Sequence, residues 1–297
     1  AGTAPMAFDA AIASEICSAK YRFAPPQGDP EPDVTATWSR VAAALAEAER
    51  PEDRARMRAQ FLDALTDFRF LPAGRILAGA GTGRQVTLFN CFVMGRIEDD
   101  LSAIFDAVKE AARTMQQGGG IGQDFSTLRP QGAIVHSIGA DASGPVSFMD
   151  VWDAMCRTIM SAGHRRGAMM ATLRCDHPDI ETFIEAKRDP ARLRNFNLSV
   201  LATDAFMKAV ASGDRWPLVF GGSEVRAVGA AGLWDRLMRA TYDVAEPKSS
   251  RLTSDDLCRE GNIVEQIGER AGRIRELRLL MKNEPLYGHY AGHSDYS

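Results

Sequence analysis

Residues 86–93 read VTLFNCFV, a compact apolar run of strand length. The run is rich in β-branched and aromatic side chains, and its continuous apolar character is typical of a strand inside a sheet. We therefore predict a buried strand here. Residues 97–117 follow it with apolar side chains at helical spacing, and residues 38–70 precede it with two such stretches separated at Pro51.

The remaining chain continues this alternation. Strand-like runs are separated by helical patterns, and together they lie at 123–128, 147–161, 169–173, 179–188, 197–202, 204–211, 216–220 and 230–244. Strands that alternate with helices predict an α/β fold with a largely parallel sheet. From residue 248 onward the sequence is charge-mixed and mostly helical in pattern. We divide the chain into a helical region at 1–70, an α/β region at 71–247 and a helical or flexible tail at 248–297.

Composition excludes several classes of protein. With 45% apolar and 25% charged residues, the 297-residue chain is neither collagen-like nor wholly disordered. Its formal charge of −4 and the absence of a Lys/Arg-rich run argue against nucleic-acid binding. No apolar run approaches the roughly 18 residues of a membrane span, and the first 17 residues do not resemble a secretory signal. We expect a cytoplasmic protein that binds neither nucleic acid nor membranes.

The cysteines are odd in number, widely spaced and form no C-x-x-C pair: Cys17, Cys91, Cys156, Cys175 and Cys258. This pattern argues against a disulfide framework and against a structural zinc site. Cys175-Asp176-His177 looks metal-like, but its close spacing suits no standard four-ligand site, so we predict no metal. Taken alone, a cysteine in an apolar strand is more often a small core residue than a reactive thiol.

Two glycine clusters, at 79–83 and 118–122, suggest nucleotide binding at first sight. Neither fits G-x-G-x-x-G, because Arg84 and Phe125 stand where the third glycine belongs, and neither continues into a P-loop. Turns that need a positive φ or a close backbone approach are the simpler interpretation. The pair Arg165-Arg166 could hold a phosphate, although a solvated loop explains it as well.

Four long segments, taken together and in order, form a recognisable pattern. They are FLPAGRILAGAGT…VTLFNCFVMG (70–95), MQQGGGIGQDFSTLRPQGA (115–133), ASGPVSFMDVWDAMCRTIMSAGHRRGAMMATLRCDHPDIETFI (142–184) and LRNFNLSVLATDAFM (193–207). From about Ile12 to Pro247 the chain strongly resembles the catalytic chain of adenosylcobalamin-dependent, class II ribonucleotide reductases. The resemblance implies an N-terminal helical segment and the first half of a ten-stranded α/β barrel. It also implies radical reduction of ribonucleotides, in the manner of a ribonucleoside-diphosphate reductase, which supplies deoxynucleotides for DNA synthesis.

The resemblance further implies roles for residues near the predicted strand. Cys91 matches the first cysteine of the pair that reduces the substrate and ends as a disulfide. Ala73, Asn90 and Gly120 match positions that line the ribonucleotide, with Gly120 allowing its close approach. Adenosylcobalamin is the implied cofactor.

A second set of residues matches a regulatory site for a deoxynucleoside triphosphate effector. Asp99 lies where the family places a carboxylate near the effector ribose, although the run Glu98-Asp99-Asp100 also reads as the acidic start of a helix. The loop at 161–169, with Arg165 and Arg166, matches the element that communicates effector identity to the substrate site.

Beyond Pro247 the resemblance is expected to end. The family continues there into a second half-barrel with the radical cysteine on a finger loop, and the run around Cys258 imitates that loop but arrives too soon. Half of a closed barrel exposes sheet edges, so we expect a second chain that carries the other half, or a homodimer. Two alternatives stay open: a non-catalytic deoxynucleotide-binding or interaction protein derived from the reductase, and a truncated product.

Overall fold

The computed structural model describes residues 11–135, 139–159 and 168–252, in two compact units that meet between Asn90 and Cys91. The description that follows treats each unit by itself. Within these residues, none of the helices combines the length and the apolar character that crossing a bilayer requires.

The first unit is helical, as predicted. It contains α1 (Ala11–Lys20), α2 (Val34–Ala46), α3 (Arg54–Leu65), the short 3-10 helix η1 (Thr66–Phe68) and α4 (Gly74–Gly79). The α2 helix begins at Asp33, whose carboxylate accepts a hydrogen bond from the backbone N–H of Ala36 at 2.9 Å. Its apolar face, with Trp38 and Val41 at the centre, packs against α1, α3 and α4 in one hydrophobic cluster.

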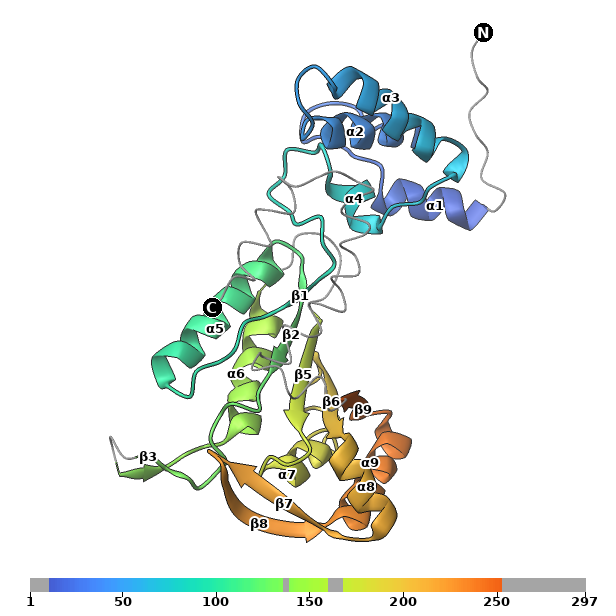
Figure 1. Ribbon diagram of the computed structural model, residues 1–297. Helices are drawn as coiled ribbons and strands as arrows, with labels where there is room; N and C mark the ends of the chain where they lie inside the picture. The colour runs from blue at the N-terminus through green and yellow to red at the C-terminus, as the bar shows by residue number, and fades with distance from the viewer. Residues whose placement is uncertain (1–10, 136–138, 160–167, 253–297) are drawn as a thin grey trace. The chain divides into compact units, whose positions relative to one another are not determined.

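The second unit is built on a five-stranded parallel sheet (Figure 1). Its strands, in spatial order, are β1 (Cys91–Val93), β2 (Gly120–Asp124), β5 (Met169–Arg174), β6 (Phe196–Thr203) and β9 (Lys248–Leu252). The connections contain α5 (Leu101–Gln116), α6 (Pro145–Thr158), α7 (Ile180–Glu185), α8 (Asp204–Ser212) and α9 (Ala230–Val244). The predicted α/β fold with a parallel sheet is confirmed, and the strand count agrees with the first half of a ten-stranded barrel.

The two faces of this sheet differ because side chains alternate along each strand. One face carries Ile121, Ala171 and Leu198, which are fully or almost fully buried and pack against the helices in the main hydrophobic cluster. The opposite face, here called the open face, carries Cys91, Gly120, Gly122, Met170 and Asn197 at register positions. On the open face Cys91, Val93 and Asn197 are exposed.

Two antiparallel hairpins complete the second unit: β3 (Ile134–Val135) with β4 (Ala140–Asp141), and β7 (Arg215–Phe220) with β8 (Ser223–Gly229). The sequence predicts β7 but not β8. In β8 the first four residues are exposed and mostly polar, so no apolar run marks the strand. The hairpin instead depends on Gly221 and Gly222, whose φ values of 57° and 78° suit a tight turn.

The predicted buried strand at 86–93 is wrong in length and in burial. Only Cys91–Val93 is a strand, and it lies at the edge of the sheet with its first and last residues exposed. Val86 and Leu88 approach Gly79 of α4, and Leu88 packs in the cluster of the first unit. The apolar run is therefore shared between two units, which its composition does not indicate.

Two further element boundaries differ from the prediction. The strand expected at 123–128 begins at Gly120 and ends at Asp124, so part of the second glycine cluster is strand and not turn. After Pro247 the chain forms β9, which pairs in parallel with β6. The sheet thus extends into residues that we expected to belong to a helical tail.

Gly119 supplies a test of the packing around β1. A Cβ atom at this position would lie 2.6 Å from Cε2 of Phe92 and 3.0 Å from Cγ2 of Thr114. We expect Gly119→Ala to lower the free energy of unfolding by about 1–3 kcal/mol, because the packed ring must shift. Gly232→Ala, where a Cβ meets nothing within 4 Å, is the control and should be neutral or stabilising in denaturant unfolding. Equal stability of both variants would contradict this packing.

Candidate functional site

Cys91 is the first residue of the edge strand β1, where its side chain is exposed on the open face. Its register partner on β2 is Gly120, and Val93 is likewise paired with Gly122. Both glycines stand on the same face as Cys91 and have no side chain that could cover the thiol. The interpretation of Cys91 as a buried core residue is therefore wrong. Gly120 and Gly122 of the second glycine cluster leave the sheet face beside the thiol without larger side chains.

The other described cysteines differ from Cys91 in accessibility. Cys17, Cys156 and Cys175 are buried. Burial raises the pKa of the Cys156 and Cys175 thiols to about 11, so both stay protonated at neutral pH. Among the described cysteines, Cys91 alone is exposed to solvent; Cys258 lies outside the described residues.

Asp99 lies between β1 and α5 and forms a close pair with Arg129, which follows β2. Asp99 Oδ2 is 2.8 Å from Arg129 Nε, and Oδ1 accepts the backbone N–H of Arg129 at 3.1 Å. Arg129 Nη2 also donates to the Asp99 carbonyl at 3.0 Å. The two side chains remain 28% and 30% exposed, so a ligand can reach them.

In the acidic run before α5, Asp99 and Asp100 have different hydrogen-bond partners. Asp100 is the N-cap, and its carboxylate accepts the backbone N–H of Ala103 at 3.1 Å. Asp99 instead pairs with Arg129. Sequence reasoning missed Arg129, because it lies 30 residues away and belongs to no local motif.

A buried polar row crosses the open face near the carboxyl ends of β2 and β5. Asp124 Oδ1 accepts hydrogen bonds from Ser126 Oγ at 2.7 Å and from its register partner Thr172 at 3.0 Å. Burial raises the pKa of Asp124, although these hydrogen bonds oppose the shift. The row ties the segment after β2 to the neighbouring strand.

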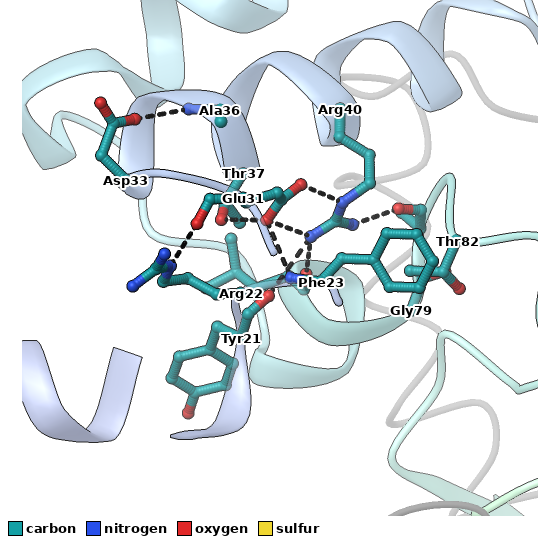
Figure 2. A network of polar contacts seen from close by, with 12 residues as sticks. Tyr21, Arg22, Phe23, Glu31, Asp33, Ala36, Thr37, Arg40, Gly79 and Thr82 are labelled. Carbon is teal, nitrogen blue, oxygen red and sulfur yellow. Dashed lines mark hydrogen bonds and ion pairs between the residues drawn. The ribbon is translucent and has the colours of Figure 1, made fainter. Parts of the chain in front are cut away.

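In the first unit, Ala73 is the exposed residue before α4. Arg40, a partly buried arginine, forms hydrogen bonds with the end of this short helix (Figure 2). Arg40 Nη2 donates to the carbonyl of Leu77 at 2.9 Å, and Nη1 donates to the carbonyl of Ala80. These carbonyls lie at the end of α4, where backbone acceptors lack helical partners. Arg40 thereby fixes the segment that begins at Ala73.

The charge of Arg40 is balanced by Glu31, at 2.7 Å between Nε and Oε1. The two side chains are only 11% and 12% exposed. Glu31 Oε2 also accepts hydrogen bonds from Thr37 Oγ1 at 2.6 Å and from the backbone N–H of Phe23 at 2.9 Å. Burial alone would raise the pKa of Glu31, but hydrogen bonds from Arg40, Thr37 and Phe23 outweigh it and lower the pKa.

The structure brings some of the sequence-predicted site residues together. Cys91 and Gly120 are direct register partners. Ala73 and Asn90 are exposed residues of the first unit. Arg165 and Arg166 lie outside the described residues.

In the metal-like run at 175–177, both ring nitrogens of the histidine make hydrogen bonds to the backbone. His177 Nε2 is 2.9 Å from the carbonyl of Leu128, and Nδ1 accepts the backbone N–H of Asp179 at 3.0 Å. Both ring nitrogens are thus occupied. Over the described ranges, no group of three or more His, Cys, Asp or Glu side chains is placed to hold a metal ion.

Comparison with known proteins identifies the family of both units. Residues 89–268 match the family described as ribonucleotide reductase, barrel domain, and residues 8–85 match ribonucleotide reductase, all-alpha domain. The barrel-domain match runs past Pro247, where we expected the resemblance to end, and β9 lies within this additional part.

Individual relatives cover most of the chain but only part of their own length. A vitamin B12-dependent ribonucleoside-diphosphate reductase of Mycobacterium tuberculosis (strain CDC 1551 / Oshkosh) is 38% identical over 234 residues, which is 77% of this chain and 34% of the relative. A protein of the same name from Thermoplasma acidophilum is 35% identical over 71% of this chain and 27% of its own length. The chain therefore spans about a third or less of the curated relatives that it matches.

The Arg40–Glu31 pair generates a stability test. Arg40→Met should lower the free energy of unfolding of the first unit by about 3 kcal/mol, since it leaves a poorly exposed carboxylate without its cation. The double variant Arg40→Met/Glu31→Gln should lose less than Arg40→Met alone. Calorimetry of the wild type, the two single variants Arg40→Met and Glu31→Gln, and the double variant completes the cycle. Strictly additive losses would contradict the coupling.

The same four proteins carry the pH dependence. Because folding lowers the pKa of Glu31, its contribution is complete above the ordinary value of about 4.3 and is lost as the pH falls through the lower, folded value. The stability difference between the wild type and Glu31→Gln should therefore shrink below about pH 4.3. A difference that stays constant down to pH 3 would argue against the lowered pKa.

Proposed function

This chain belongs to the ribonucleotide reductase family, and from that premise we propose that it contributes the helical segment and the first five barrel strands of an adenosylcobalamin-dependent reductase. The substrate we propose is a ribonucleoside diphosphate, as in the names of its relatives. The observation that carries the proposal is Cys91, an exposed thiol on the open face beside Gly120.

The proposed role of Cys91 follows from the chemistry of the reaction. Removal of the ribose 2′-hydroxyl as water requires two electrons and two protons. Two thiols supply them when they are oxidised to one disulfide, so Cys91 needs a second cysteine whose sulfur can reach it. The other described cysteines are buried, and we place the partner on barrel strands outside the described residues.

The residues near Cys91 also fit a large substrate. Gly120 and Gly122 keep the open face beside the thiol free of side chains, which allows a nucleotide to approach the backbone closely. Ala73 and Asn90 are the further substrate-lining residues that we propose. The chemistry that adenosylcobalamin supplies when bound is the initial radical, and we assign none of its contacts to the described residues.

The pair Asp99–Arg129 supports a regulatory role. A carboxylate can accept hydrogen bonds from a ribose hydroxyl, and a neighbouring guanidinium suits the phosphates of the same nucleotide. We propose that this pair, with Arg165 and Arg166, binds a deoxynucleoside triphosphate effector. The remaining barrel strands are supplied by further polypeptide or by a partner chain, and we place the protein in the cytoplasm.

A second candidate function is deoxynucleotide binding without catalysis. It is favoured by one observation: Asp99 and Arg129 form an ion pair whose side chains stay 28% and 30% exposed, so a nucleotide could bind there without the thiol. The two functions differ in whether Cys91 matters.

The catalytic proposal is tested by Cys91→Ser in an assay that supplies the remaining barrel strands, adenosylcobalamin and a dithiol. We expect the rate of deoxynucleotide formation to fall by at least about a thousandfold, since a hydroxyl cannot form the disulfide. Cys156→Ala, which removes a buried thiol of the same unit, should keep most of the activity. The chain alone should form no deoxynucleotide. Sustained turnover by Cys91→Ser would refute the proposed role.

The regulatory proposal is tested by thermal shift with the four deoxynucleoside triphosphates at several protein concentrations. Binding to the native state should raise the melting temperature. Asp99→Ala should weaken binding about tenfold to a hundredfold, the equivalent of a charged hydrogen bond worth about 1.5–3 kcal/mol. Asp106→Ala on α5, whose carboxylate pairs with exposed Lys109, is the control and should bind as the wild type does.

Cys91→Ser should leave the thermal shift unchanged, because the thiol serves the substrate and not the effector. The absence of any shift with the wild-type chain, at every protein concentration, would count against an effector site on Asp99.

A further inference from the structure

The two-residue segment Arg129-Pro130 is held at both ends by one neighbouring turn, residues 177–179. On one side, the carbonyl of Leu128 lies 2.9 Å from Nε2 of His177. On the other side, the backbone N–H of Gln131 donates to Asp179 Oδ2 at 2.9 Å. The peptide groups that flank Arg129-Pro130 therefore both bond to a turn that follows β5, almost fifty residues further along the chain.

The hydrogen bonds determine the state of the histidine. Nδ1 accepts the backbone N–H of Asp179, so the ring proton must lie on Nε2, which donates to the carbonyl of Leu128. His177 is 2% exposed and meets the ring of Phe220 edge-on at 5.9 Å. Burial lowers the pKa of His177, against the opposing effects of the Leu128 bond and of the Asp179, Asp176 and Asp124 carboxylates. The neutral ring is the form that makes both bonds.

A third segment, at Gly144, lies close to the bond between Asp179 and Gln131. Gly144, just before α6, has a φ of 80°, and a Cβ there would lie 2.5 Å from Asp179 Oδ2 and 2.9 Å from the backbone nitrogen of Gln131. Only glycine allows this approach. A side chain at position 144 would thus collide with both partners of the Asp179–Gln131 bond.

We propose that His177 is a positioning residue that holds Arg129 in place against Asp99 and thereby sets the affinity of the effector site. The inference rests on the regulatory role proposed above for the Asp99–Arg129 pair. The 177–179 turn makes hydrogen bonds to the peptide groups on both sides of Arg129-Pro130. The backbone and the side chain of Arg129 in turn make hydrogen bonds to Asp99. A histidine that merely fills the core would not need these partners.

The test uses His177→Phe, which keeps a ring against Phe220 but removes both hydrogen bonds, and His177→Gln, which keeps a polar group. Phe206→Leu is the matched control, because Phe206 is about as buried in the same unit but packs against Trp216 and Trp234 instead. The first readout is hydrogen exchange of the Arg129 and Gln131 amides. The second is affinity for the deoxynucleoside triphosphate that gives the largest thermal shift.

His177→Phe removes the bond to Leu128, which precedes Arg129, and the bond to Asp179, which accepts the Gln131 amide. With this support lost, exchange of both amides should become about tenfold faster and deoxynucleotide binding weaker by a similar factor. His177→Gln should give exchange rates and affinities between those of the wild type and His177→Phe. Phe206→Leu should lower the melting temperature but leave both readouts unchanged. Wild-type exchange rates in His177→Phe, or a loss of affinity no larger than in Phe206→Leu, would overturn the proposal.

A measurement on the wild-type chain keeps the inference testable if His177→Phe does not fold. Nitrogen-15 spectra of the imidazole should show a neutral ring with its proton on Nε2 at pH 7, and a proton on Nδ1 would overturn the arrangement. If the wild type binds no deoxynucleotide, the effector role fails by itself. The amide exchange rates of His177→Gln then still decide whether His177 positions Arg129.

Discussion

Every strand in the five-stranded sheet runs parallel to its neighbours, so each connection must return across the length of the sheet before the next strand begins. The apolar residues of one sheet face are buried against the helices of these connections, in a single hydrophobic cluster. The opposite face carries the polar and small residues Cys91, Gly120 and Asp124, together with larger ones such as Met170. The exposure of Cys91, the glycines beside it and the polar row at Asp124 all follow from this division.

Apolar periodicity predicts the parts of this fold in which one element buries one face. The longer helices and the central strands β5 and β6 belong to this class, and their predicted bounds differ from the observed ones by few residues, whereas the short helix α4 is not predicted. The prediction fails where burial is shared or absent. Leu88 packs in the hydrophobic cluster of the helical unit although Cys91 belongs to the sheet, and the first half of β8 carries few apolar side chains. In β2 the glycines are needed as small register partners, a requirement that propensity does not express.

The match to a family pattern nominates single residues as site candidates, Cys91 and Asp99 among them. It does not predict their environments. An apolar run does not indicate that its cysteine stands on an edge strand, and no local spacing connects Asp99 with Arg129 or Leu128 with His177. These pairs depend on the parallel order of the strands, which brings the segments that follow β1, β2 and β5 to the same end of the sheet.

That common end also relates the two proposed sites to each other. The strand β2 begins at Gly120, beside Cys91, and ends at Asp124, five residues before Arg129. It is paired on both sides, and the segment after it is tied to β5 through Thr172 and to the 177–179 turn through His177. A ligand that shifts Arg129 must therefore act on a segment bonded to the central strands. The same strand that carries the glycine next to the thiol also leads to the arginine next to Asp99, and β1 likewise leads from Cys91 to Asp99. Two neighbouring strands, β1 and β2, therefore connect the proposed substrate and effector sites covalently.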